Sequence, residues 1–412
     1  MITKTPTIKS WEVVELQDVA CVESGGNAPQ GDIYFKGGKY PFIRVQHFDG
    51  SKVYIDKFDL INDEAIKKYR LKKFEKNSIV FPKSGASINL EKRAMLPMDA
   101  YVVGHLCVVR PKQIDEKFLY YILKSEKFAT SGNGSTLPFL NISHIKKRKL
   151  FITNNLDEQK SIACMLTTVQ EAIAGQEKLI TKFKELKHGM MQQLFTHGTK
   201  GEQTKTTKIG EVPESWDVVE FQNMVEFSKK PRGLSLSGSI PFVPMDMIYL
   251  DKMFITNYKL RKAVASGTFV INGDILLAKI TPSFENGKQG IIKIDSEYAY
   301  ATTEVIPFHE IVDVSNKLFI YYWLKKDDVR KDLAGKMEGS TGRQRLNKSV
   351  LDKKLMPRPS VAEQNEIASA FYTIDQKIEV AQEKLSAYQN LFKTLLHKLM
   401  SGERRVSFKY GN

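Results

Sequence analysis

Two long segments of the chain carry apolar residues at alternating steps of four and three positions. The first runs from residue 162 to 194 and the second from 367 to 399. This spacing aligns apolar side chains in one narrow stripe along a helix, which is the pattern of a coiled coil. The seam residues, as we call this stripe, are Ile162, Leu166, Val169, Ile173, Ile180 and Phe183 in the first copy, and Ile367, Phe371, Ile374, Ile378, Leu385 and Phe392 in the second.

Capping signals bound both segments and predict helices of roughly 40 residues. Asn155-Leu156-Asp157-Glu158 and Ser360-Val361-Ala362-Glu363 have the form of capping boxes, and Gly198 and Gly402 stand where helix stops are expected. Such helices are about 60 Å long at about 1.5 Å per residue. A helix with one narrow apolar stripe needs a partner, so we predict that the two copies pair antiparallel within the chain. Pairing with helices of another subunit is the alternative.

Two polar residues interrupt the first seam, Gln176 and Lys187. Polar seam residues cost stability but can fix register and partner choice. The alternative is that both lie at frayed edges of the seam.

The helices belong to a duplication of the whole chain. Trp11–Gln17 reappears as Trp216–Gln222 at an offset of 205 positions, and the same offset carries Glu158-Gln159 onto Glu363-Gln364. It also carries Gly134-Ser135-Thr136 onto Gly339-Ser340-Thr341. A repeat of half the chain indicates two similar domains rather than a solenoid of short repeats.

The regions before the helices have mixed character. Short β-branched and aromatic runs, such as Tyr40–Val45, Ser78–Phe81, Tyr101–Val103 and Leu106–Val109, predict strands, whereas Phe118–Leu123 and Leu318–Leu324 predict short helices. The predicted fold is therefore α+β, with two domains in tandem. The predicted boundaries are 1–154 for the first domain, 155–197 for its long helix, 198–212 for an exposed linker, 213–359 for the second domain, 360–402 for its helix and 403–412 for a basic tail.

The charge of the chain indicates a polyanionic partner. Lys and Arg number 62 against 47 Asp and Glu, which gives a net charge of +15. Nucleic acid is the obvious candidate, and a basic protein whose charge only aids solubility is the alternative. Three widely spaced cysteines, a polar N-terminus and the lack of any long apolar run favour a cytoplasmic chain that does not enter a membrane.

The sequence lacks the motifs that an enzyme of DNA would need. It has no phosphate-binding Gly-x-x-x-x-Gly-Lys-Ser/Thr loop, no Asp/Asn-Pro-Pro-aromatic motif and no His/Cys spacing typical of metal ligands. Glu158-Gln159-Lys160 and Glu185-Leu186-Lys187 match a nuclease-like Glu-x-Lys, but both lie in the predicted helices, where we expect solvated surface. No catalytic residue, metal ligand or cofactor site is predicted.

The candidates for DNA contacts are polar loops directly after apolar strands, together with the residues that follow the repeated Gly-Ser-Thr segment. Cations suit phosphates, and arginine forks, amides and hydroxyls suit base edges. The candidate residues are Arg44, Gln46, Lys83, Ser84 and Ser87 in the first half, and Lys279, Thr281, Ser283, Lys288, Arg343, Gln344 and Arg345 in the second. Leu137-Pro138-Phe139 replaces the Gly342–Arg345 run in the first half, so the two domains should read different bases.

With these features, the chain resembles the specificity subunits of Type I restriction–modification systems. The resemblance rests on the duplicated domains, on Glu-Gln near the start of each long helix, and on Gly273–Pro282, which looks like a segment of that family's target-recognition domains. It implies that each domain reads one half of a split double-stranded DNA target, while the helices act as a spacer and dock two modification (methyltransferase) subunits. Those partners would use S-adenosylmethionine to methylate adenine. Restriction subunits would use ATP and Mg to cut DNA, and this chain would bind no cofactor.

Three other functions remain open at this stage. The chain could be an enzyme with unfamiliar motifs, a coiled-coil scaffold that binds protein only, or the specificity subunit of a related enzyme with fused methyltransferase and nuclease.

We predict that Arg343→Ala relaxes sequence choice at one half-site. If the arginine reads a guanine, the loss is about 1–3 kcal/mol on the cognate sequence. Binding titrations on variant targets check this, and an equal loss on all sequences would indicate a phosphate contact instead.

Overall fold

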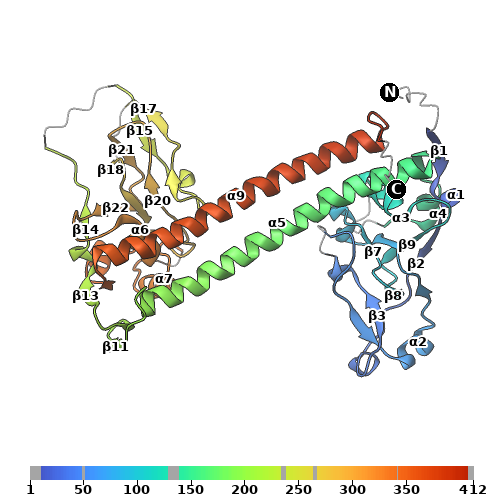
Figure 1. Ribbon diagram of the computed structural model, residues 1–412, viewed down its shortest axis with the longest axis horizontal. Helices are drawn as coiled ribbons and strands as arrows, with labels where there is room; N and C mark the ends of the chain where they lie inside the picture. The colour runs from blue at the N-terminus through green and yellow to red at the C-terminus, as the bar shows by residue number, and fades with distance from the viewer. Residues whose placement is uncertain are drawn as a thin grey trace. The chain divides into compact units, whose positions relative to one another are not determined.

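The computed structural model describes residues 11–48, 52–128, 139–232, 238–262, 267–340 and 342–406, and the statements below refer to these residues. The chain forms two compact units (Figure 1). The first unit combines Met1–Ile180 with Val380–Asn412, and the second is Thr181–Glu379. Each long helix therefore contributes one end to each unit.

The first unit is built on one strand pair and two four-stranded sheets. Strand β1 (Trp11–Glu15) pairs antiparallel with β10 (Lys149–Thr153). One sheet has the order β2-β9-β6-β7, with β2 at Ala20–Ser24, β6 at Ile79–Pro82, β7 at Ala94–Met95 and β9 at Leu106–Pro111. The other has the order β4-β3-β8-β5, with β3 at Tyr40–Ile43, β4 at Asp59–Ile61, β5 at Lys73–Phe74 and β8 at Ala100–Val102.

Short helices complete this unit and close its core. They are α1 (Leu16–Val19), α2 (Asp63–Tyr69), α3 (Glu116–Ser125) and α4 (Ile142–Lys146). The six consecutive residues Phe118–Leu123 of α3 are all buried, because this helix lies in the main core beside the alternate residues of β6 and β9. The opposite side chains of β6 and β9 enter a second core with β3 and β8.

The second unit repeats this topology. Strands β13 (Asp217–Glu220) and β23 (Leu355–Arg358) pair as β1 and β10 do. A five-stranded sheet has the order β14-β22-β19-β20-β16, with β14 at Val225–Phe227, β16 at Phe254–Ile255, β19 at Ile275–Ala278, β20 at Gln289–Ile292 and β22 at Val305–Glu310. The four-stranded sheet β17-β15-β21-β18 has β15 at Ile240–Val243, β17 at Lys259–Arg261, β18 at Thr268–Ile271 and β21 at Tyr298–Ala301.

Two helices of the second unit, α6 (Lys317–Trp323) and α8 (Lys348–Asp352), correspond to α3 and α4 of the first. A further helix is α7 (Asp327–Ala334), and α6 is buried along most of its length, as α3 is. The strands and short helices predicted from the first half, and the helix predicted at Leu318–Leu324, are present with shifts of one or two residues.

The long helices are α5 (Leu156–His197) and α9 (Val361–Met400), and they run antiparallel within each unit. In the first unit, Ile162 and Leu166 of α5 share a core with Leu399 of α9. In the second unit, Phe195 of α5 stacks on Phe371 of α9, with ring centroids 5.7 Å apart. The predicted α+β fold, with two tandem domains each followed by a long helix of this pair, is thus confirmed.

The seam residues lie on the inner face of these helices, and none of the twelve is exposed. Ile162, Leu166, Ile173, Ile180, Ile367, Phe371 and Ile374 are buried, while Val169, Phe183, Ile378, Leu385 and Phe392 are half-buried. The helices end as expected, because Gly198 and Gly402 adopt φ values of 63° and 73°, which favour glycine.

Lys187 makes a specific contact across the helix pair of the second unit. Its amine forms an ion pair with Asp375 of α9, and Asp375 also accepts a hydrogen bond of 2.8 Å from the hydroxyl of Tyr322. This network favours the view that Lys187 fixes the register of the seam. Gln176 is half-buried, and its Oε1 has no hydrogen-bond partner among the described residues.

The prediction that Glu158 and Gln159 lie on solvated surface is wrong. Only 5% and 4% of their surfaces are exposed, because the first turn of α5 packs against the end of β10. Asn155 caps the helix by accepting from the amide of Glu158 at 3.1 Å. The Glu158 carboxylate, however, accepts from Thr153 Oγ1 at 2.8 Å and pairs with Arg405, rather than turning back to the amide of Asn155.

One boundary segment also differs from the prediction. Residues 198–212, predicted as an exposed linker, contain a β-hairpin of β11 (Thr204–Thr207) with β12 (Gly210–Pro213), and Val212 is buried. The sequence did not predict this hairpin because the Thr-rich strand β11 lacks the alternating apolar residues that usually indicate a strand, although Thr itself favours strands. Arg405, near the start of the predicted basic tail, forms an ion pair with Glu158.

Candidate nucleic-acid interface

In the second unit, the fold brings together two of the predicted DNA-contact segments. The chain after β19 lies beside the chain that leads into α8, and the two exchange backbone hydrogen bonds. The amide of Thr281 donates to the carbonyl of Gln344 at 3.0 Å, and the amide of Leu346 donates to the carbonyl of Lys279 at 2.7 Å. The amide of Gln344 donates to Thr281 Oγ1 at 3.0 Å.

A further lysine ties this loop to the segment after β15. Lys288 Nζ donates to the carbonyl of Met245 at 3.0 Å, and its own amide donates to the carbonyl of Ser283 at 2.9 Å. The Lys288 amine is therefore engaged with the protein, whereas no ion pair or side-chain hydrogen bond is recorded for Lys279 among the described residues.

Arg345 is held by a carboxylate that the sequence did not single out. Its Nε lies 3.0 Å from Glu304 Oε2, and its Nη2 lies 2.9 Å from Glu304 Oε1. These hydrogen bonds lower the pKa of Glu304 and raise the pKa of Arg345, so both groups stay charged. Glu304 lies in the turn between β21 and β22, where its carbonyl accepts from the amide of Lys279 at 2.9 Å.

The first unit contains the same backbone arrangement. The amide of Leu140 donates to the carbonyl of Lys83 at 2.8 Å, and the amide of Lys83 donates to the carbonyl of His105 at 2.9 Å. Ser84 forms an isolated bridge with Phe139, as Ile280 does with Arg345. We call this arrangement the paired-loop site, which consists of Lys83, Ser84, His105 and Phe139 in the first unit and Lys279, Ile280, Glu304 and Arg345 in the second.

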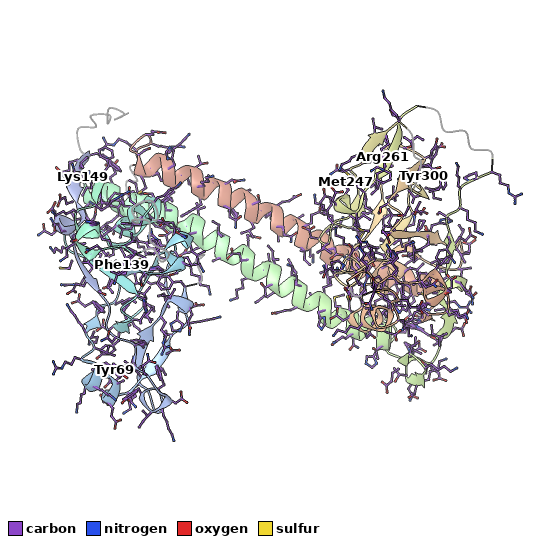
Figure 2. The ribbon with its side chains drawn as sticks, turned by 180° about the vertical axis from the view of Figure 1, so that it is seen from behind. Tyr69, Phe139, Lys149, Met247, Arg261 and Tyr300 are labelled. Atoms are coloured by element: carbon purple, nitrogen blue, oxygen red, sulfur yellow. The ribbon has the colours of Figure 1, made fainter. Side chains whose placement is uncertain are left out.

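The side chains at the two paired-loop sites differ. In the first unit, Ser84 Oγ and His105 Nδ1 form a hydrogen bond of 2.7 Å. Phe139, which Figure 2 labels, is 54% exposed, and the amine of Lys83 lies 4.8 Å from the centroid of its ring. An aromatic side chain thus stands in the first unit where a carboxylate-bound arginine stands in the second.

The remaining candidates are less closely connected to these sites. Arg44 pairs with Asp59 at 2.8 Å, Gln46 is exposed, and no described contact joins either of them to Lys83. Ser87 Oγ donates to the carbonyl of Ser84 at 3.2 Å, and Arg343 is exposed. Gly134-Ser135-Thr136, Leu137-Pro138 and Thr341 lie outside the described residues.

Sequence reasoning missed His105 and Glu304. Both follow a strand of the repeated pair, β8–β9 or β21–β22, at the same turn. An alignment of these strands between the two halves would have placed them at equivalent positions, but the local insertions shift their spacing away from the main offset.

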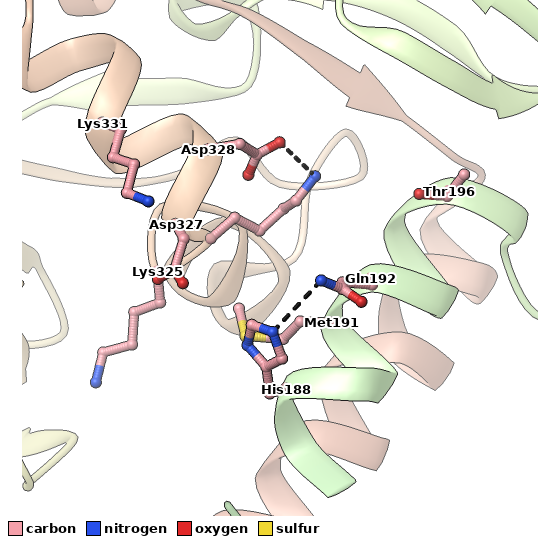
Figure 3. Close-up of a pocket in the computed structure, with 9 residues that line it drawn as sticks. His188, Met191, Gln192, Thr196, Lys325, Asp327, Asp328 and Lys331 are labelled. Atoms are coloured by element: carbon pink, nitrogen blue, oxygen red, sulfur yellow. Dashed lines mark hydrogen bonds and ion pairs between the residues drawn. The ribbon is translucent and has the colours of Figure 1, made fainter. Parts of the chain in front are cut away.

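Apart from the paired-loop site, the second unit contains a hollow that is lined on one side by α5 and on the other by the segment around the start of α7 (Figure 3). Its charges are mixed, since Lys326 pairs with Asp328 at 3.2 Å and Lys325 and Asp327 lie beside them. Burial, followed by repulsion from Lys187, lowers the pKa of Lys325 to about 8.

The lowered pKa predicts that Lys325→Met stabilises the chain at pH 7. In the unfolded chain this amine stays protonated up to a pH near 10.5, whereas in the folded chain it loses its proton near pH 8. The buried charge therefore lowers the free energy of unfolding by its full amount below about pH 8, and this loss of stability shrinks as the pH rises towards 10.5. We expect a gain of about 1 kcal/mol at pH 7, reduced for the partial exposure of the group, and a smaller gain near pH 10. Urea unfolding at both pH values measures this.

Lys331→Met is the matched control, because Lys331 lines the same hollow but is exposed. It should leave stability unchanged at both pH values. An equal gain for Lys325→Met at pH 7 and pH 10 would contradict the prediction.

Other classes of site are not found in the described part of the chain. It contains no group of three or more His, Cys, Asp or Glu side chains placed to hold a metal ion. None of its helices has the length and apolar character needed to cross a membrane.

Two α+β domains with the same loop scaffold, different side chains on that scaffold and a pair of long helices have the architecture of a DNA specificity subunit. The Type I restriction modification DNA specificity domain matches residues 8–185 and 213–387, and the chain belongs to this family. The family confirms the predicted resemblance, and it consists of specificity subunits rather than catalytic ones.

Relatives and solved structures agree with this assignment. The Type I restriction enzyme MjaIX specificity subunit of Methanocaldococcus jannaschii is 35% identical over 190 residues, which is 45% of this chain and 44% of that relative. The MjaVIII specificity subunit of the same organism is 26% identical over 97% of this chain and 94% of its own length. The crystal structure of a Type I restriction–modification S subunit from M. genitalium, 17% identical, shares the fold with a TM-score of 0.62 over 97% of this chain and 98% of that chain.

Proposed function

We propose that the chain reads a bipartite double-stranded DNA target, with one half-site for each domain. The observation that carries this proposal is the paired-loop site, which has the same backbone in both units and different side chains on it. A repeated scaffold presents side chains at equivalent places, so a change from Phe139 to Arg345 changes which base edge is accepted.

The positive charge of the chain supports binding to the DNA backbone, and the helix pair supports a fixed spacer between the half-sites. A net charge of +15 attracts the DNA backbone without regard to sequence. Helices α5 and α9 pair along an apolar seam and cannot stretch, so they would fix the spacer between the half-sites. Their exposed faces would dock two methyltransferase subunits, with restriction subunits joining the complex in the cytoplasm. S-adenosylmethionine, ATP and Mg would be bound by those partners.

Mapping methylated adenines tests this function. The chain is co-expressed with the methyltransferase subunits of its system in cells that lack adenine methylation, and genomic DNA is sequenced by a method that detects N6-methyladenine. The expected result is one asymmetric motif of two specified parts separated by a fixed unspecified spacer.

The same experiment separates the alternatives. Methylation that does not depend on this chain would indicate a protein scaffold, and a continuous motif would contradict the bipartite reading. If the chain produces the bipartite motif with a single polypeptide that also cuts DNA, it serves the related class of fused enzymes.

A further inference from the structure

We infer that Arg345 reads a guanine in the half-site of the second domain and that Glu304 is the positioning residue that aims it. This inference rests on the proposed function and assigns one base contact within it. The sequence offered Arg343, Gln344 and Arg345 without distinguishing them, whereas the structure sets Arg345 apart.

The hydrogen bonds of Arg345 determine which edge of its guanidinium is available. Glu304 binds the side edge, formed by Nε and Nη2. The end edge, formed by Nη1 and the outer hydrogen of Nη2, has no partner recorded among the described residues, and half of the side chain is exposed to solvent. This end edge carries two parallel donors, which match the O6 and N7 acceptors of guanine in the major groove.

The backbone around Arg345 is fixed as firmly as its side chain. The amide of Arg345 donates to the carbonyl of Glu338 at 2.8 Å, and the amide of Glu338 donates back to the carbonyl of Arg345 at 3.0 Å. The turn that carries Glu304 is joined to the same loop through Lys279. Because the Arg345 side chain is already held in place, it loses little conformational freedom when a base binds, and the entropic cost of the contact is low.

Arg343 lacks such support. It is exposed, and no carboxylate partner is recorded for it among the described residues. In the first unit, Phe139 takes the place of Arg345 and His105 takes the place of Glu304, so the same guanine contact is not available there. The inference therefore concerns the second half-site alone.

The test compares methylation motifs of the full complex carrying wild-type chain, Arg345→Ala or Glu304→Ala. We expect the wild-type motif to require guanine at one base pair of the second half-site. Arg345→Ala should reduce that preference at least about tenfold, and Glu304→Ala should reduce it at the same base pair by a smaller factor. The first half-site should be unchanged in both variants.

Arg358→Ala is the matched control. Arg358 pairs with Asp217 at 2.7 Å through a partly exposed guanidinium in the same unit, but it lies on β23, outside the paired-loop site. This variant should keep the wild-type motif. If Arg345→Ala does not assemble with its partners, Arg345→Lys decides, since lysine keeps the charge without two coplanar donors and should also lose the preference.

The other outcomes overturn the inference. A second half-site without a specified guanine, an unchanged motif in Arg345→Ala, or an equal loss on all sequences would each show that Arg345 does not read a guanine, while the bipartite function would stand. A wild-type complex without any bipartite motif would overturn the proposed function and this inference together.

Discussion

Insertion of four residues after Ile180 and four after Glu379 should lengthen the unspecified spacer of the DNA target. The two positions mark the limits of the compact units on α5 and α9, so each unit keeps its own antiparallel contacts. Four helical residues add about 6 Å, which is the length of up to two base-pair steps of about 3.4 Å. The original target should lose methylation, and a target whose spacer is one or two base pairs longer should gain it. Mapping methylated adenines measures the change.

A single insertion is the control for this experiment. Four extra residues in α5 alone shift its seam against that of α9 by about one turn, so the helix pair should weaken and methylation should fall on all targets. An unchanged spacer in the double insertion would refute the idea that the helices set the distance between half-sites.

Glu363→Ala should destabilise the second unit by about 3 kcal/mol. The carboxylate is 1% exposed, and it accepts from Trp216 Nε1 at 3.1 Å and from the amide of Thr199 at 3.0 Å. It also pairs with Lys200 at 3.3 Å. Removal of the acceptor leaves the indole N–H of the fully buried Trp216 without a partner and opens space at the start of α9. Urea unfolding followed by tryptophan fluorescence reports this, since two of the three tryptophans, Trp216 and Trp323, lie in the second unit.

Two variants bracket this effect. Glu363→Gln keeps one acceptor oxygen and should cost less than half as much as Glu363→Ala. Glu366→Ala removes an exposed carboxylate that also accepts from Thr199, and it should change stability by less than about 0.5 kcal/mol. A cost for Glu363→Ala no greater than that for Glu366→Ala would mean that the buried bonds of Glu363 contribute little.

The candidate site was only partly accessible to sequence reasoning. The loops around Lys83 and Lys279 could be chosen because polar residues follow apolar strands at corresponding places in both halves, and Arg345 because it follows the repeated Gly-Ser-Thr segment. Their association could not be inferred, since Ser84 and Phe139 meet through a bridge between distant parts of the chain. Glu304 lies 41 positions from Arg345, and nothing in its immediate neighbourhood marks it as the partner.

The duplication, the α+β class and the two long helices with their apolar seam were all predictable from the amino-acid sequence. These features follow from local periodicity and from repeated residues, which need no knowledge of distant contacts. The burial of individual polar groups and their hydrogen-bond partners became evident only from the folded chain. Glu158 was expected on the helix surface and Glu363 in a capping box, but β10 and Arg405 pack against Glu158, and Trp216 and Thr199 pack against Glu363. Burial and hydrogen-bond partners depend on segments that are remote in the chain, so the positions of individual charges emerge only when the whole domain is assembled.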